Sequence, residues 1–105
     1  EWQRGVLDLC VLHILADGPT YGYSIAARLT DAGFADVKGG TLYPLLKRLE
    51  GAGLVDVEWR PGEAGPGRKF YLINTAGRQR LMALTASWQR YSTTVTRLLD
   101  EGSLS

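Results

Sequence analysis

Apolar residues recur along this chain with helical spacing in four stretches, and two shorter stretches have the pattern of β-strands. The first helical stretch, residues 5–16, has almost no polar side. A helix that is apolar all round must be covered on most of its sides, and a chain of 105 residues buries only a modest core. We therefore expect a second subunit to cover part of this helix, and we expect His13 to be a core residue.

A second helix is predicted over residues 21–32, where Ile25 and Leu29 share one face. Thr20 is its expected N-cap, because a threonine hydroxyl can accept a hydrogen bond from the first helical turn. Gly33 is the expected stop, since glycine readily adopts the left-handed conformation that ends many helices.

The third helix lies within "GGTLYPLLKRLEGAGLV", residues 39–55, and its buried face is made of leucines. These are Leu42, Leu45, Leu46 and Leu49. Thr41 is the expected N-cap, which places Pro44 in the first turn, where its missing N–H costs little. Gly51 and Gly53 mark the predicted end of the helix.

Two strands follow. Residues 54–59, "LVDVEW", alternate between apolar and polar positions, and residues 68–74, "RKFYLIN", form a second strand-like run. The segment between them, "RPGEAGPG", contains three glycines and two prolines. This arrangement predicts a β-hairpin whose loop is longer than a tight turn.

The last helix is predicted from Thr75 to about Asp100, and its apolar residues repeat at spacings of three and four. These residues are Leu81, Leu84, Trp88, Tyr91, Val95 and Leu98. Such a heptad seam on a terminal helix is typical of pairing with another helix, so we expect a homodimer. The alternative is that the seam packs on its own domain.

The order of three helices, a hairpin and a long helix predicts an α+β fold that is mainly α. We interpret it as a winged helix-turn-helix with a long C-terminal dimerisation helix. Residues 1–74 would form the DNA-binding domain and residues 75–105 the dimerisation helix.

The charged residues are unevenly distributed, although the net charge is only +1. Residues 1–37 carry two basic against five acidic residues, whereas residues 38–80 carry eight basic against four acidic ones. Positive charge is therefore concentrated around the third helix and the hairpin, which favours an anionic partner. The alternative is an ordinary solvated surface.

With its leucines turned inward, the third helix leaves polar and basic residues on or near its outward side. These are Thr41, Tyr43, Lys47 and Arg48, together with Pro44. The DNA major groove admits one α-helix, and such side chains can bind phosphates or base edges. At the hairpin, Arg60 precedes the loop and Arg68 and Lys69 follow it, where they can reach a minor groove or its phosphates. Glu63 opposes phosphate contact at the tip.

Three segments resemble the PadR family of bacterial transcriptional regulators. They are "VLHILADGPTYGYSIAARL" (11–29), "GGTLYPLLKRLEGAGLV" (39–55) and "RKFYLINTAGRQRL" (68–81). A single C-terminal helix resembles the short subfamily. The resemblance implies a homodimeric winged-helix repressor that binds double-stranded DNA at an inverted-repeat operator and releases it on sensing a small molecule.

Carried over by position, the resemblance implies that the DNA-facing region comprises Thr41, Leu42, Tyr43, Lys47 and Arg48. It further implies a DNA-backbone contact by Tyr21, in "TYGY". The chain departs from the family in its hairpin loop, which is only partly basic. It also has Asn74 where members often have threonine, so we expect a local change in helix capping.

In some short PadR-like drug sensors a planar aromatic ligand lies between the subunits beside tryptophans. The resemblance therefore implies that Trp88, in the middle of the seam, is the candidate effector-binding residue, and Trp2 could help to line the site. The alternative is that Trp88 only packs the dimer core.

Other classes of function find little support. One cysteine and one histidine are too few for a metal site within a chain, and no nucleophile–base pair or phosphate loop has supporting context, so we expect neither an enzyme nor a cofactor. The lone Cys10 favours a reducing, cytoplasmic location, and no apolar run is long enough to span a membrane. A winged-helix protein–protein interaction module and an aromatic small-molecule sensor with weak DNA binding remain the rival interpretations.

Overall fold

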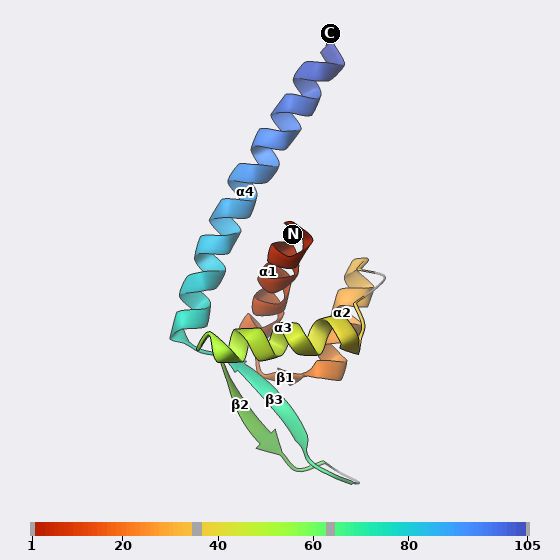
Figure 1. Cartoon of the computed structure of the whole chain (residues 1–105), viewed down its shortest axis with the longest axis vertical. Helices are drawn as coiled ribbons and strands as arrows, with labels where there is room; N and C mark the ends of the chain where they lie inside the picture. Colours follow the sequence, from red (N-terminus) through yellow and green to blue (C-terminus); the bar gives the residue numbers. More distant parts are fainter. Residues whose placement is uncertain (1, 35–36, 63–64, 105) are drawn as a thin grey trace.

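The computed structural model describes residues 2–34, 37–62 and 65–104. Its elements follow in the order α1 (Trp2–Ala16), β1 (Thr20–Tyr21), α2 (Gly22–Ala32), α3 (Gly39–Gly51), β2 (Val55–Arg60), β3 (Arg68–Ile73) and α4 (Thr75–Leu104). The four predicted helices and the two predicted strands are all present, and the chain is mainly helical with a small antiparallel sheet (Figure 1).

The core lies between α1, α2 and α3, with the sheet closing one side of it. It contains the four leucines of α3, which are exposed by 3% or less, and five apolar residues of α1. Its further members include Val11, Leu12, Ile25, Leu29 and Tyr71. Because the apolar face of α3 is fixed inward by this packing, the opposite face of the helix is fixed outward.

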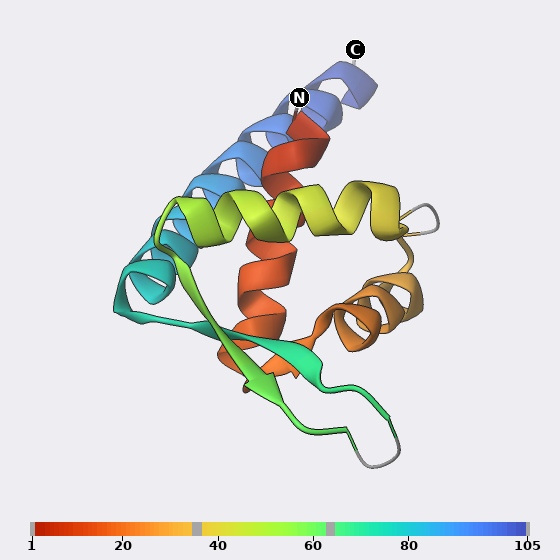
Figure 2. The ribbon, with the colours of Figure 1, turned by 60° about the horizontal axis from the view of Figure 1, so that its bottom comes forward.

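The hairpin of β2 and β3 is joined to the helical body by β1, in the sheet order β1-β3-β2. Strand β1 has only two residues, Thr20 and Tyr21, which pair with Tyr71 and Phe70. The sequence did not predict β1, because two residues are too few to show an alternating pattern. Beyond this pairing the hairpin projects away from the helices (Figure 2).

Two of the predicted helix starts were wrong. The N-cap of α2 is Tyr21 rather than Thr20, and the N-cap of α3 is Lys38 rather than Thr41. The amides of Thr41 and Leu42 already donate to the carbonyl of Lys38, at 2.9 and 2.8 Å, so α3 begins three residues earlier than expected. Pro44 consequently lies inside the helix and not in its first turn.

The predicted stop of α2 at Gly33 is confirmed. This glycine has a left-handed φ of 113°, and its N–H donates to the carbonyl of Thr30 at 3.0 Å. A residue with a Cβ adopts this conformation only with strain, which is why glycine ends the helix here.

Asn74 links the sheet to α4. Its side-chain oxygen accepts the N–H of Gly77 at 2.8 Å, and its amide nitrogen donates to the carbonyl of Gly53 at 2.9 Å. The side chain therefore caps α4 and also ties its start to the turn after α3.

Helix α4 passes α1 and continues far beyond the rest of the molecule (Figure 1). The molecule measures 61 × 28 × 22 Å for this reason.

His13 of α1 is exposed, so its prediction as a core residue was wrong. Among the described residues, no helix is long and apolar enough to cross a membrane.

Candidate nucleic-acid interface

Helix α3 presents a polar side to solvent. Thr41, Tyr43 and Lys47 are exposed, as the sequence predicted. The ring of Tyr43 lies on the start of α2, where a Cβ added to Gly22 would come within 2.7 Å of ring atoms. Glycine at this position therefore leaves room for the Tyr43 ring between the two helices.

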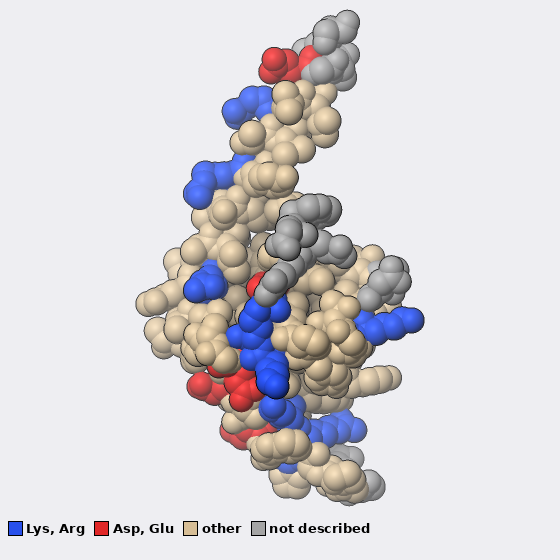
Figure 3. Space-filling view, viewed as in Figure 1, with Lys and Arg blue, Asp and Glu red and all other residues tan. Residues whose placement is uncertain are grey.

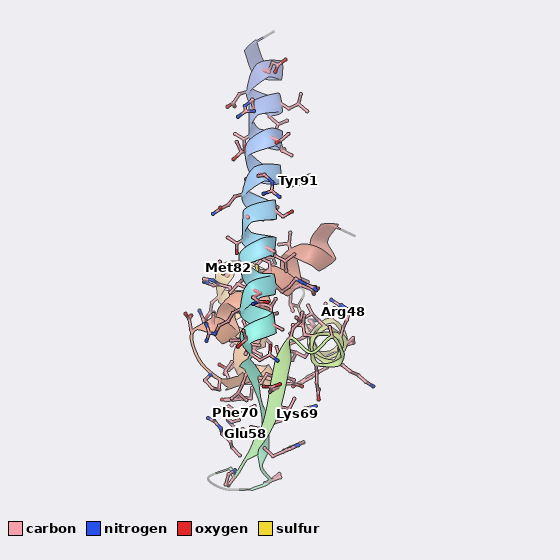
Figure 4. The ribbon with its side chains drawn as sticks, turned by 90° about the vertical axis from the view of Figure 1, so that its left-hand side faces the viewer. Arg48, Glu58, Lys69, Phe70, Met82 and Tyr91 are labelled. Carbon is pink, nitrogen blue, oxygen red and sulfur yellow. The ribbon has the colours of Figure 1, made fainter. Side chains whose placement is uncertain are left out.

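Arg48 lies on a different side of α3 from Lys47. Its guanidinium is bound to the carboxylate of Asp8 on α1, and the two side chains are only 34% and 22% exposed. Figure 4 shows Arg48 on the side of α3 away from the hairpin. Lys47 is exposed whereas Arg48 is half-buried, because adjacent helical residues point about 100° apart.

The structure reveals Asp8 as a residue that the sequence analysis missed. It is the only acidic residue in the apolar stretch 5–16. A carboxylate on a helix that packs into the core needs a partner, so this isolated charge was the available signal.

The hairpin carries its cations on two faces. Directly paired residues share a face, so the register groups Trp59 with Lys69 and groups Arg60 with Arg68. Lys69 is on the side toward α3, where its Nζ lies 3.5 Å from Glu50 Oε1. Figure 4 agrees, since it shows Lys69 toward α3 and Phe70 and Glu58 on the other side.

The opposite face holds an alternating set of rings and guanidinium groups. Arg60 lies 4.4 Å from the centre of the Phe70 ring, and Arg68 lies 4.6 Å from that of Tyr21. The Tyr21 and Phe70 rings are themselves 5.3 Å apart. Arg60 also pairs with Glu58 at 2.6 Å, which offsets part of its charge, whereas Arg68 remains exposed.

A hollow of about 500 Å³ separates the hairpin from the start of α2 and from Tyr43 of α3. Its lining residues are Tyr21, Gly22, Tyr23, Tyr43, Trp59, Arg68, Lys69 and Tyr71. Four predicted DNA-binding residues, Tyr21, Tyr43, Arg68 and Lys69, are brought together here. Tyr23 and Trp59 were missed, although both are highly exposed, at 77% and 69%.

Lysine and arginine side chains gather in a stripe that runs over α3 to the hairpin (Figure 3). Acidic side chains lie beside this stripe and not across it. An exposed helix, a projecting hairpin and a stripe of cations together form a surface suited to a polyanion. Glu63, which the sequence placed at the hairpin tip, lies outside the described residues.

A second hollow of about 280 Å³ lies between α1 and α4 and is mostly apolar. It is lined by Gly5, Val6, Leu9, Leu84, Ser87, Trp88 and Tyr91. The Trp88 and Tyr91 rings are 6.1 Å apart. The side chain of Trp2, the second predicted effector residue, lies outside the described part of the structure.

The predicted seam of α4 divides into two parts. Leu81 and Leu84 are half-buried and pack on the core of their own chain. Trp88, Tyr91, Val95 and Leu98 are exposed by 40%, 57%, 36% and 66% in the single chain.

The described residues contain no group of three or more histidine, cysteine, aspartate or glutamate side chains that could hold a metal. Burial raises the pKa of the Cys10 thiol, so the reactive thiolate is disfavoured.

Residues 11–83 match the Transcriptional regulator PadR-like family. The chain belongs to this family. It is 40% identical over 81 residues to "Transcriptional regulator Rv3488" of Mycobacterium tuberculosis, which covers 77% of this chain and 74% of the relative. As a member of the PadR family it is a transcriptional regulator and not an enzyme.

Solved structures of PadR-like regulators have the same fold. A PadR-like transcriptional regulator from Bacillus cereus aligns with a TM-score of 0.83 and 38% identity, over 90% of this chain and 92% of the other. A Streptococcus transcriptional regulator aligns with a TM-score of 0.85 and 33% identity, over 93% and 96% of the two chains. The predicted winged helix-turn-helix fold and the resemblance to PadR regulators are confirmed.

Proposed function

We propose that this PadR-family protein is a homodimeric, sequence-specific repressor that binds an inverted-repeat operator. In this proposal α3 enters the major groove of double-stranded DNA and the hairpin lies along the neighbouring backbone. The observation that carries the proposal is the surface formed by the outward side of α3, the aromatic hollow and the cations of the hairpin.

The DNA-binding residues divide by element. Thr41, Tyr43 and Lys47 on α3 would reach base edges and nearby phosphates, because they are exposed on the side away from the core. Tyr21, Arg68 and Lys69, which line the hollow, would bind the backbone, and Arg60 would bind it from its place beside Arg68. We assign Arg48 to positioning α3, because Asp8 already holds it.

The dimer would form through α4, with residues 75–105 acting as the dimerisation helix and residues 1–74 as the DNA-binding domain. Four seam residues, Trp88 to Leu98, are exposed in the single chain along a helix that leaves the body. A soluble protein rarely leaves such a row of large apolar side chains uncovered, and a second copy offers an equal row.

A gel-shift titration against DNA from upstream of the protein's own gene tests DNA binding. The proposal expects a shift that resists nonspecific competitor and weakens steeply with salt, because bound cations release counterions from DNA. A shift that competitor removes, or that salt leaves unchanged, would count against a sequence-specific regulator. If the same surface instead binds a partner protein with an affinity that salt does not change, that result would favour a protein–protein interaction module.

The hollow between α1 and α4 supports a ligand-responsive form of the proposal. Its apolar lining and the Trp88 ring suit a planar aromatic effector. Binding there would change how α4 sits on α1 and so disfavour the operator-matched dimer. Planar aromatic compounds should quench tryptophan fluorescence in the unaltered protein but not in Trp88→Ala; equal quenching in both proteins would remove Trp88 from the effector site.

A further inference from the structure

Trp59 is an unusually exposed tryptophan. It stands near the end of β2, its side chain is on the face of the hairpin toward α3, and 69% of its surface is accessible. Tryptophan is highly buried on average in folded proteins, so this ring contributes little to the core. The described part of the chain places no second ring in stacking contact with it.

The neighbours of Trp59 define the partner that would fit. In the hairpin register it is paired directly with Lys69, so a flat ring and an ammonium group stand side by side on one face. The same hollow contains the exposed Arg68 and the ring of Tyr43 from α3. A partner for this face must therefore offer negative charge and a flat apolar surface close together.

The backbone of double-stranded DNA offers both features, in alternation along each strand. Its phosphates carry the charge, and the deoxyribose rings between them expose apolar faces. A purely apolar partner would offer no negative charge to Arg68 or Lys69. The ion pair of Lys69 with Glu50, 3.5 Å long and on the surface, contributes little, so a phosphate can replace Glu50 as the partner of Lys69. The alternation of ring and cation thus favours the sugar–phosphate backbone over a protein surface.

We propose that Trp59 packs its ring against a deoxyribose of the operator while Lys69 binds an adjacent phosphate. This inference rests on the proposed DNA binding and adds a contact that does not depend on charge. Trp59 would strengthen binding to DNA in general and would set how closely the hairpin approaches the groove beside the one that α3 occupies.

Salt dependence separates the two kinds of contact. Trp59→Ala should weaken operator binding about tenfold at every salt concentration, because it removes the burial of an apolar surface and no charge. Lys69→Gln should instead lower the slope of log affinity against log salt by about 1, since one phosphate contact is lost. Met82→Ala is the matched control, because Met82 is about as exposed as Trp59, at 73%, but lies on α4.

Fluorescence gives a second readout. DNA should quench tryptophan emission in the unaltered protein, and Trp59→Phe should lose most of that quenching while keeping most of the affinity. This variant also guards against misfolding of Trp59→Ala, which circular dichroism and a melting curve would reveal.

Two results would overturn the inference. One is operator binding by Trp59→Ala that equals binding by the unaltered protein, and the other is quenching that persists in Trp59→Phe. In both cases the proposed function stands, because the unaltered protein binds DNA. If the unaltered protein itself binds no operator, the proposed function falls as well.

Discussion

Arg48 shows how a single contact can change the role that is inferred for a residue. A basic residue on an exposed helix is an obvious candidate for DNA contact, and the helical spacing that turns Arg48 about 100° from Lys47 does not by itself exclude it. The bond to Asp8 supplies that reason, because a guanidinium that already satisfies a half-buried carboxylate stays beside α1. We infer that the ion pair fixes the orientation of α3 relative to α1.

The matched variants Lys47→Met and Arg48→Met test this assignment. Lys47→Met should lower the salt slope of operator binding by about 1 and leave stability unchanged, since an exposed phosphate contact is lost. Arg48→Met should keep the slope but destabilise the fold by about 1–2 kcal/mol, because Asp8 loses its partner. Titrations at several salt concentrations and thermal melts measure both quantities. A lowered slope in Arg48→Met would return Arg48 to the DNA interface.

At the scale of single residues, the sequence predicted which side chains are exposed better than it predicted which side chains form ion pairs with each other. Thr41, Tyr43 and Lys47 follow directly from the inward leucines of α3, because helical geometry fixes the opposite face. The bond between Asp8 and Arg48 joins residues that are 40 positions apart in the chain. No local pattern could reveal it.

The junction between the sheet and α4 is closely packed at Gly77. Gly77 packs closely against Leu54, which follows the turn after α3. A Cβ added to Gly77 would lie 2.1 Å from the carbonyl oxygen of Leu54 and 2.7 Å from the Ile73 side chain. Its N–H is also bonded to the Asn74 cap. The direction in which α4 leaves the body is therefore set by backbone contact and not by flexible side chains.

Gly77→Ala should consequently destabilise the protein. Relief of the clash must move backbone, so we expect a loss of about 2 kcal/mol, typical of overpacking. For a domain of this size such a loss lowers the melting temperature by roughly 10 °C. Gly51→Ala is a suitable control, because an added Cβ there meets nothing within 4 Å. Equal melting temperatures for the two variants would show that the junction tolerates movement.

The sequence predicted the number and type of the large elements because each carries its own periodic pattern. It missed β1 and misplaced the starts of α2 and α3, since these depend on tertiary pairing with β3 and on backbone bonds to Lys38. A threonine before a leucine repeat favours an N-cap, but the two glycines ahead of Thr41 already adopt the helical conformation.

At the scale of the whole molecule, the exposed half of α4 is the main evidence for a dimer. A helix that extends beyond its body with Trp88, Tyr91, Val95 and Leu98 uncovered is stable in water when a second helix covers it. A pair of chains related by a two-fold axis would present two copies of α3 to DNA. Such symmetry would match an inverted-repeat operator, with half-sites one helical turn apart.

Hydroxyl-radical footprinting of the bound operator tests this central claim most directly. Two copies of α3 in successive major grooves should protect two patches of the backbone whose centres lie about 34 Å apart. Leu98→Asp, which places a charge on the seam, should lose the joint protection at the same protein concentration. Two patches at that spacing would support a dimer that reads DNA with α3. A single protected patch, or protection without a repeat of one turn, would contradict it.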